Sequence, residues 1–315
     1  MEAWILTPGT SPLSRNIEDY PEGIIIPIDK PYRWTSADVI RKVKYAAIRH
    51  FGKKNLKVGH AGTLDPLATG VLLVCIGKAT KLAEELQSHD KEYVAGITFG
   101  ATTPSYDLEK EIDRFFPHEH ITAEAVAEAL PGFIGEQDQI APLFSAKSVD
   151  GVRAYELARK LHAEGKTLDE AAQELIRVAK INITELELVE YSDGARSDLG
   201  RSLRSPHHCA SLVVPPLPCR GWHDPRVTPD TNTESNASSR INVTDNSELG
   251  LPRAVVRMAC SKGTYVRAFA RDLGEALGSG AHLDSLQRSR SGIFRVENAL
   301  TVEQAINLLS APKAL

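Results

Sequence analysis

Residues 58–72 read Val-Gly-His-Ala-Gly-Thr-Leu-Asp-Pro-Leu-Ala-Thr-Gly-Val-Leu. Two glycines and a proline within eight residues are typical of a tight loop. The loop carries one carboxylate, Asp65, and it leads into a continuous apolar run at 71–76, of the kind that forms a buried strand. We therefore expect Asp65 to be rigidly presented just before a buried strand. From this stretch alone, a structural turn or capping role for Asp65 is the simpler interpretation.

Outward from this loop, the sequence predicts short strands and amphipathic helices. A helix is expected to begin at Thr35, because Thr35 and Asp38 have capping-box spacing and apolar residues then recur at helical period. Strands and helices alternate irregularly between Gly/Pro breaks, which favours a mixed α+β fold over a parallel doubly wound one. No GxGxxG or Walker A sequence occurs, so a nucleotide-cofactor enzyme is disfavoured. Strands are expected over 24–28, 71–76, 92–99, 181–189 and 254–258, and helices over 35–49, 78–86, 122–130, 152–161, 168–178, 264–277 and 301–309.

Composition is ordinary for a soluble globular protein of 315 residues, and no apolar stretch is long enough to span a membrane. We expect a cytoplasmic protein without a disulfide scaffold, since its four cysteines are few and scattered. The net charge is −4, but positive charge gathers at 30–60 and again at 253–295. From charge alone, the simpler interpretation is that both stretches form solvent-exposed faces of the protein.

Residues 191–252 differ in character from the rest of the chain. They are rich in Ser, Asp, Asn, Thr, Pro and Gly and carry little periodic apolar pattern, so we expect a flexible insertion. A passive loop and a tether for a partner are both open interpretations. Zinc binding is disfavoured because the candidate ligands form no paired CxxC; these candidates are His207, His208, Cys209, Cys219 and His223.

Further motifs lie upstream and downstream of residues 58–72 in a recognisable order. They are Asp29-Lys30-Pro31 with Trp34-Thr35-Ser36, Gly77-Lys-Ala-Thr-Lys81 with Lys91-Glu-Tyr93, Phe144-Ser-Ala-Lys with Gly151 and residues 154–159, and Cys260-Ser-Lys-Gly-Thr-Tyr-Val-Arg267 with Asp272-Leu-Gly and Gly280-Ala-His-Leu283. Together they resemble the TruB family of pseudouridine synthases over residues 23–296, outside the insertion.

The resemblance implies the pseudouridine synthase fold, a mixed and mostly antiparallel central sheet flanked by helices, with a catalytic cleft. It also implies a domain organisation. We expect an N-terminal tail at 1–22, a catalytic domain formed by 23–190 and 253–300, the insertion at 191–252, and a C-terminal helix and tail at 301–315 without a PUA domain.

The activity implied is conversion of the T-loop uridine of tRNA, position 55, to pseudouridine by base flipping, without metal or cofactor. Asp65 would be the essential carboxylate, Arg267 its partner, and Tyr93 the ring that stacks on the target base. We expect these three side chains to meet in one pocket wide enough for an extruded pyrimidine. Tyr265, Leu286 and His60 would complete the substrate pocket, and Lys30, Lys78, Lys81, Arg41 and Lys42 would bind RNA through its phosphates. The expected partner is the T-arm stem-loop, bound by a monomer.

Each assignment has a plainer alternative. Arg267 could form a surface ion pair, Tyr93 could be packing, and His60 could bond within its own loop. The whole chain could instead be an RNA-binding or RNA-folding module, or could modify another RNA. One departure from the family pattern is Thr103-Pro-Ser105, where Thr-Asp-Thr is common, although Asp107 is retained.

Overall fold

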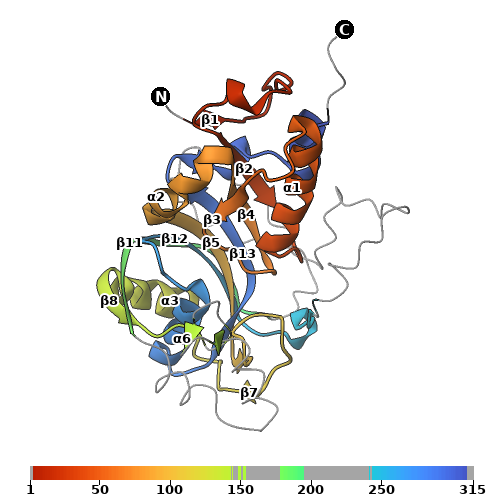
Figure 1. The fold of residues 1–315 in the computed structure, drawn as a ribbon. Helices are drawn as coiled ribbons and strands as arrows, with labels where there is room; N and C mark the ends of the chain where they lie inside the picture. Colours follow the sequence, from red (N-terminus) through yellow and green to blue (C-terminus); the bar gives the residue numbers. More distant parts are fainter. Residues whose placement is uncertain are drawn as a thin grey trace.

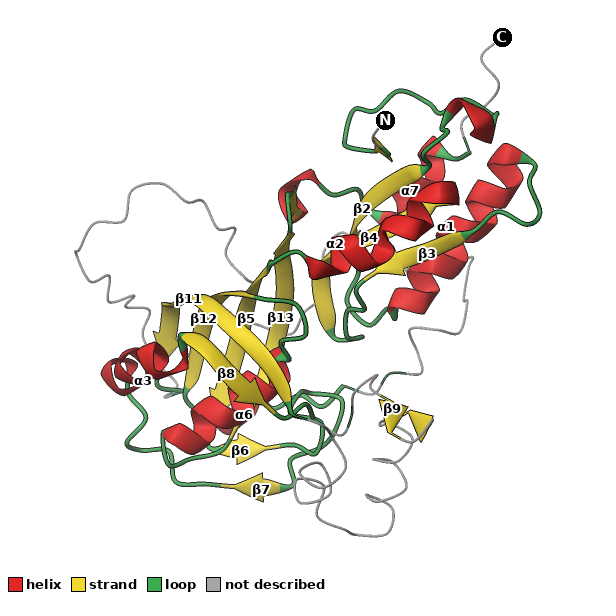
Figure 2. Cartoon of the chain, turned by 60° about the vertical axis from the view of Figure 1, so that its left-hand side comes forward, coloured by secondary structure: helices red, strands yellow, loops and turns green. Residues whose placement is uncertain are grey.

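The computed structural model describes residues 3–142, 144, 148–149, 152–153, 178–194, 241 and 243–310. Within these residues the chain builds one curved sheet of ten strands (Figures 1 and 2). The main path runs β1-β2-β4-β13-β5-β12-β11-β8, with β3 on β4 and β14 on β13. Only the β1–β2 and β4–β13 pairs of this sheet are parallel, so the predicted mixed, mostly antiparallel sheet is confirmed. The strands are β1 (Trp4–Ile5), β2 (Ile24–Lys30), β3 (Val58–Ala61), β4 (Ala68–Ile76), β5 (Lys91–Phe99), β8 (Gly135–Gln139), β11 (Ala179–Ser192), β12 (Arg253–Cys260), β13 (Ala281–Ser291) and β14 (Phe294–Arg295).

Helices pack beside this sheet at both of its ends (Figure 2). At one end lie α1 (Ser36–Phe51), α2 (Ala83–Ser88) and α7 (Val302–Leu308); at the other lie α3 (Ala123–Ala129) and α6 (Val266–Ala276). The predicted capping box of α1 is present, with the Thr35 hydroxyl accepting from the Asp38 amide and the Asp38 carboxylate accepting from the Thr35 amide. Two small ladders, β6 (Ala101–Thr102) with β7 (Arg114–Phe115) and β9 (Ser148–Val149) with β10 (Val152–Arg153), lie off the main sheet.

Two hydrophobic cores meet where β4 begins. One core joins β2 and β4 to α1 and α7, and the other joins β5, β12 and β13 to α6 and α3. Strands β4 and β13 pair only over Ala68–Gly70 and Leu286–Arg288, so the halves of the sheet are joined at the residues that directly follow the Asp65 loop. Gly70 is required at this junction, because its φ is +99° and an added Cβ would lie 2.3 Å from the Arg288 carbonyl oxygen.

The structure differs from the predicted elements in a few places. His60, expected in a loop, lies in β3, and β11 continues to Ser192, inside the predicted insertion. The helix predicted over 152–161 is wrong at its start, because Val152–Arg153 form the strand β10. The rest of that helix, the helix predicted over 168–178 apart from Val178, most of the Phe144-Ser-Ala-Lys block and the body of the insertion fall outside the described residues, as do the insertion's candidate metal ligands. Of the described helices, none has both the length and the apolarity that crossing a bilayer would take.

Candidate active site

The Asp65 loop is bonded to the first turn of α1. The Ser36 hydroxyl accepts from the Leu64 amide (3.0 Å) and donates to the Leu64 carbonyl (3.1 Å). The Asp65 carbonyl accepts from the Ala68 amide, which closes the turn into β4. The Asp65 side chain stays 37% exposed, so a fixed backbone presents a carboxylate that a substrate can reach.

A buried arginine holds the other side of the loop. Arg288 of β13 donates from Nε to the Val71 carbonyl (2.7 Å) and from its two Nη atoms to the carbonyls of Gly62 (3.2 Å) and Thr63 (3.4 Å). These donors satisfy loop carbonyls that would otherwise be costly to bury. Arg288 belongs to the basic stretch at 253–295, for which charge alone predicts a solvated face, but its side chain is buried.

Arg267, in the first turn of α6, reaches the Asp65 carboxylate. Its Nε lies 2.9 Å from Asp65 Oδ2, an ion pair rather than an aligned hydrogen bond, and 3.9 Å from Asp107 Oδ2. Its Nη1 donates to the Ser105 carbonyl (3.1 Å). Burial lowers the pKa of Arg267, but Asp65 and Asp107 outweigh it and raise that pKa above the ordinary value. The surface-pair alternative is wrong, because the Arg267 side chain is only 6% exposed.

Asp107 is a buried carboxylate behind this pair. It accepts from the Ser105 hydroxyl (2.6 Å) and from the Glu109 amide (3.0 Å). Burial raises its pKa, and the Arg267 guanidinium opposes that shift. The arrangement is therefore one guanidinium between an exposed and a buried carboxylate.

Tyr265 sits two residues before Arg267, at the N-terminal end of α6. Buried Gln139 of β8 accepts from the Tyr265 amide (2.8 Å) and donates to the Tyr265 carbonyl (3.2 Å). This pair of bonds fixes where α6 starts, and so helps to aim Arg267. Gln139 could not be singled out from the sequence, because a polar residue in a strand that is otherwise half exposed has no recognisable pattern.

A cavity of ≈ 20 Å³ adjoins the ion pair, with room for about one water molecule. Its lining includes Asp65, Asp107, Leu108, Arg267, Asp284 and Leu286. The predicted pocket position of Leu286 is thus supported. The cavity itself is smaller than a pyrimidine, but it is open to solvent beside the 37% exposed Asp65 side chain, so a pocket wide enough for an extruded base stays a prediction.

Tyr93 lies beneath this site in β5. It is buried in the same core cluster as Leu64 and Ala68, which flank Asp65, but it is not among the residues that line the cavity. Burial raises the pKa of the Tyr93 phenol, Arg288 lowers it, and Asp65 raises it further, so the ring lies within electrostatic reach of the loop. The structure thus joins Asp65 to Arg267 directly and places Tyr93 behind them.

His60 and most of the predicted phosphate-binding residues lie at the surface. His60 is half-buried, with its Nδ1 buried and unpartnered, and burial lowers its pKa. Of the described residues, none therefore bonds to Nδ1, so the alternative of a bond within the loop finds no support at this nitrogen. Arg41 pairs with Asp38 and Lys78 pairs with Glu22 at 3.9 Å, while Lys81 is exposed and Lys42 is half-buried.

The prediction that Lys30 binds phosphate is wrong. Its side chain is fully buried, and Nζ donates to the carbonyls of Pro31 (2.8 Å), Trp34 (2.6 Å) and Pro66 (3.2 Å). Three acceptors match the three N–H groups of an ammonium, so none is left for RNA. Lys30 instead ties the residue after Asp65 to the turn before α1.

Lys30 should make stability depend on pH. Burial lowers its pKa from 10.5 to about 7, against the raising effect of Asp65 and Asp29. Between these two pH values the unfolded chain binds a proton that the folded chain has lost, so the free energy of unfolding should rise with pH, at most by about 1.4 kcal/mol per pH unit. Below about pH 7 the contribution should be flat, because Lys30 is charged in both states.

Urea unfolding of the wild type and of Lys30→Met between pH 6 and 10 tests this expectation. Lys91, whose burial lowers its pKa to about 8, is present in both proteins and cancels in the difference. Equal pH slopes for the two proteins would show that Lys30 keeps its ordinary pKa.

No cluster of His, Cys, Asp or Glu suited to a metal occurs among the residues that the structure describes. The site therefore consists of a reachable carboxylate, the guanidinium that holds it, a buried phenol and apolar walls.

The chain matches the N-terminal domain of TruB family pseudouridylate synthases over residues 49–197, and the C-terminal domain of tRNA pseudouridylate synthase B over residues 267–311. It is 44% identical to tRNA pseudouridine synthase B of Phocaeicola vulgatus over 285 residues, which cover 90% of this chain and 92% of that one. The enzyme of the same name from Thermus thermophilus is 38% identical over 288 residues, covering 91% and 78%. Among solved structures, an H/ACA ribonucleoprotein bound to a substrate RNA containing 2′-deoxyuridine gives a TM-score of 0.49 at 20% identity, over 91% of this chain and 53% of that one. By its identity to the two tRNA pseudouridine synthases B and its match to the family's domains, the chain belongs to the TruB family of tRNA pseudouridine synthases.

Proposed function

We propose that this protein converts the T-loop uridine at position 55 of tRNA to pseudouridine, with Asp65 as the essential group. The observation that carries the proposal is the 2.9 Å ion pair between Asp65 and the buried Arg267, at the junction of the two halves of the sheet. The full-length similarity to tRNA pseudouridine synthases supports the substrate class.

The reaction breaks the bond between N1 of uracil and C1′ of ribose, and forms a bond between C5 and C1′. N1 gains a proton and C5 loses one, so no group is left over and no redox partner is needed. Among the described residues no hydrogen bond or ion pair is found at Asp65 Oδ1, so this oxygen could act on the ribose–base unit while Oδ2 stays paired with Arg267. A guanidinium in a water-poor site holds the carboxylate in place and matches its negative charge.

Tyr93 and Leu286 would form the floor and one side of the site for the detached uracil. Because burial raises the pKa of Tyr93, its phenol keeps its proton at neutral pH and can stack on the base or donate a hydrogen bond to it. The base must be extruded from the RNA loop, and the ≈ 20 Å³ cavity must open to receive it.

Mapping of pseudouridine tests the proposal. Purified protein is incubated with unmodified tRNA and with a T-arm stem-loop, and each uridine is scored. We expect modification at the T-loop uridine of both RNAs. A folded wild-type protein that leaves that uridine unmodified would defeat the proposal, and modification only elsewhere in total RNA would redirect it to another substrate.

A basic hollow of ≈ 520 Å³ offers a second contact for RNA. Lys44, Lys54 and Lys57 line it together with the backbone at 58–59 and Thr80, and no acidic residue is among its lining. Backbone phosphates are the ligand that such a surface suits, since unpaired lysines bind them without reading sequence.

Lys54→Gln should therefore weaken tRNA binding and reduce the salt slope of log Kd by about 1. The control is Lys53→Gln, because Lys53 pairs with Glu18 at 3.1 Å and is not among the residues that line the hollow. Filter binding between 50 and 300 mM salt measures both. Equal slopes for the two variants would remove the hollow from the RNA interface.

A further inference from the structure

The insertion extends a hairpin that is already closed at its base. Ser192 of β11 pairs with Arg253 of β12, and Gly194 lies against Gly250, where an added Cβ would be 2.2 Å from the Gly250 carbonyl oxygen. Removal of residues 195–249 would leave residues 193, 194, 250, 251 and 252 as the connection, a common hairpin loop length. The strands therefore do not need the insertion in order to pair.

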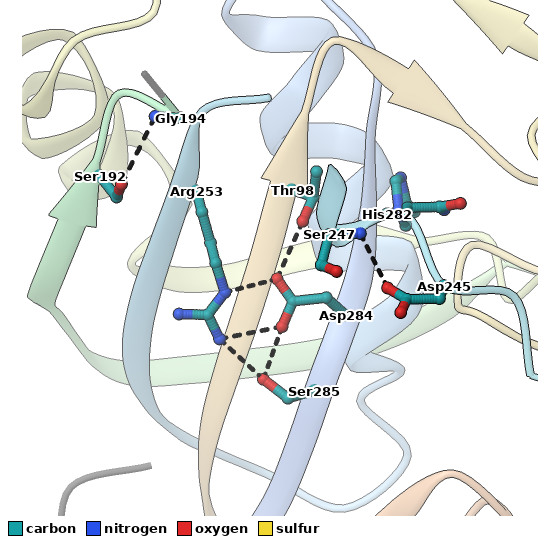
Figure 3. A network of polar contacts seen from close by, with 10 residues as sticks. Thr98, Ser192, Gly194, Asp245, Ser247, Arg253, His282, Asp284 and Ser285 are labelled. Carbon is teal, nitrogen blue, oxygen red and sulfur yellow. Dashed lines mark hydrogen bonds and ion pairs between the residues drawn. The ribbon is translucent and has the colours of Figure 1, made fainter. Parts of the chain in front are cut away.

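The last part of the insertion does not hang from this hairpin but lies on the active-site cleft. We call Ile241 and residues 243–250 the strap. The Thr244 amide donates to the Leu108 carbonyl (2.8 Å), and Asn246 Nδ2 lies 3.3 Å from Nε2 of the buried His282. Figure 3 shows Asp245 and Ser247 of the strap next to His282 and Asp284.

The other end of the strap reaches the opposite half of the protein. Arg33, in the turn before α1, donates from Nη2 to the Ile241 carbonyl (2.8 Å), and Ile241 is buried. Residues 241 and 244 are at most about 11 Å apart along an extended chain. The strap thus bridges the α1 half and the β13 half of the molecule at the cleft between them.

Both attachment turns are strained. Arg33 (φ +62°) and Tyr106 (φ +56°) are the two non-glycine residues with positive φ in the described part of the chain. Arg33 binds the strap directly, and Tyr106 is two residues before Leu108. Such conformations persist only where surrounding contacts hold them, and they gather at functional sites.

The bonded carbonyl belongs to the cavity wall. Leu108 and Asp107 both line the ≈ 20 Å³ cavity, and Asp107 backs Arg267. Asp284, which also lines the cavity, is fixed by a separate network, in which Arg253 binds both of its carboxylate oxygens at 2.6 and 2.9 Å (Figure 3). The strap ties the Leu108 wall to the α1 half.

We infer that the strap is a positioning element of the catalytic site: it holds the Asp107–Leu108 wall, and through Asp107 it holds the Asp65–Arg267 pair, in the geometry that isomerisation requires. It lies outside the two family matches, which end at residue 197 and resume at 267. The catalytic part of this inference rests on the proposed function, whereas the wall-holding part does not.

Two deletions separate the strap from the rest of the insertion. In the first, residues 195–249 are removed and Gly194 is joined to Gly250; in the second, residues 195–240 are replaced by a flexible Gly/Ser linker and the strap is kept. We expect both proteins to fold. The first should lose about tenfold or more in kcat on a T-arm stem-loop, with Kd changed less than kcat, and the second should stay within about threefold of the wild type.

Amide hydrogen exchange gives a readout that needs no activity. Peptides covering residues 103–109 should exchange faster in the 195–249 deletion and in Thr244→Pro, which removes the donor to Leu108. They should exchange at the wild-type rate in the linker variant and in Thr244→Ala, which keeps the N–H. Wild-type kcat in the 195–249 deletion, equal impairment of both deletions, or unchanged exchange would each overturn the inference. An inactive wild type with the expected exchange pattern would defeat the proposed function and leave the wall-holding role standing.

Discussion

Asp65→Asn should abolish turnover while leaving RNA binding intact. We expect kcat to fall on the order of 10³-fold or more, because the amide keeps the shape of the carboxylate but not its charge. The free energy of unfolding should change little, since the Asp65 side chain is 37% exposed. The backbone of its loop is held by hydrogen bonds from the side chains of Ser36 and Arg288. Single-turnover assays on a T-arm stem-loop measure the chemical step, and thermal unfolding checks the fold.

Asp113→Asn is the matched control. Asp113 is an acid away from the cleft whose carboxylate accepts a bond from the Thr102 hydroxyl in an exposed position. It should retain wild-type kcat. If Asp65→Asn also retained kcat, the carboxylate would be structural and the enzyme assignment of this site would fail. If Asp65→Asn lost kcat but supported normal growth of a deletion strain, RNA binding would be the property that the cell needs.

Arg267→Met should damage stability and turnover together. It removes the guanidinium from a buried site and leaves the Asp107 carboxylate, 8% exposed, without its counter-charge. Removing one partner of a buried ion pair costs about 3–5 kcal/mol of unfolding free energy. Turnover should also be lost, because Asp65 would no longer be held at its Oδ2.

Three further variants test whether the lost ion pair causes the expected loss of stability and turnover in Arg267→Met. Arg267→Met with Asp107→Asn should be more stable than Arg267→Met alone, because the unpaired charge is gone. Arg267→Lys should recover part of the stability but little kcat, since an ammonium cannot reproduce the guanidinium contacts to Asp65 and Ser105. Arg257→Met, which breaks the more exposed pair between Arg257 of β12 and Glu187 of β11, should cost no more than about 1 kcal/mol. A similar small cost for Arg267→Met would show that Arg267 is not structurally paired.

Local physics made much of the fold predictable. Capping chemistry placed the start of α1 at Thr35, and Thr122 caps α3 by accepting from the Ala125 amide, as predicted. The apolar run at 71–76 became the fully buried part of β4. These features depend on neighbours a few residues apart, so the sequence displays them directly.

Local sequence patterns did not predict which charged side chains are buried. Lys30, Arg267 and Arg288 were indistinguishable from solvated residues by composition, yet all three are buried, and each is bound by carbonyls or carboxylates from distant parts of the chain. A basic side chain is buried only where the fold brings acceptors to it. The periodicity of a single helix or strand does not show which acceptors from distant segments will surround a basic side chain.

The sequence alone predicts that Asp65 lies in a tight loop before a buried strand, and its motifs resemble those of TruB-type enzymes. The structure was needed to show which arginine meets that carboxylate, that Lys30 is buried, how small the cavity beside the ion pair is, and that the end of the insertion is bonded to the cavity wall. The physical reason is that loop shape and strand burial follow from near neighbours and side-chain chemistry. Ion-pair partners, cavity volume and docking contacts depend instead on how segments far apart in the chain pack against each other.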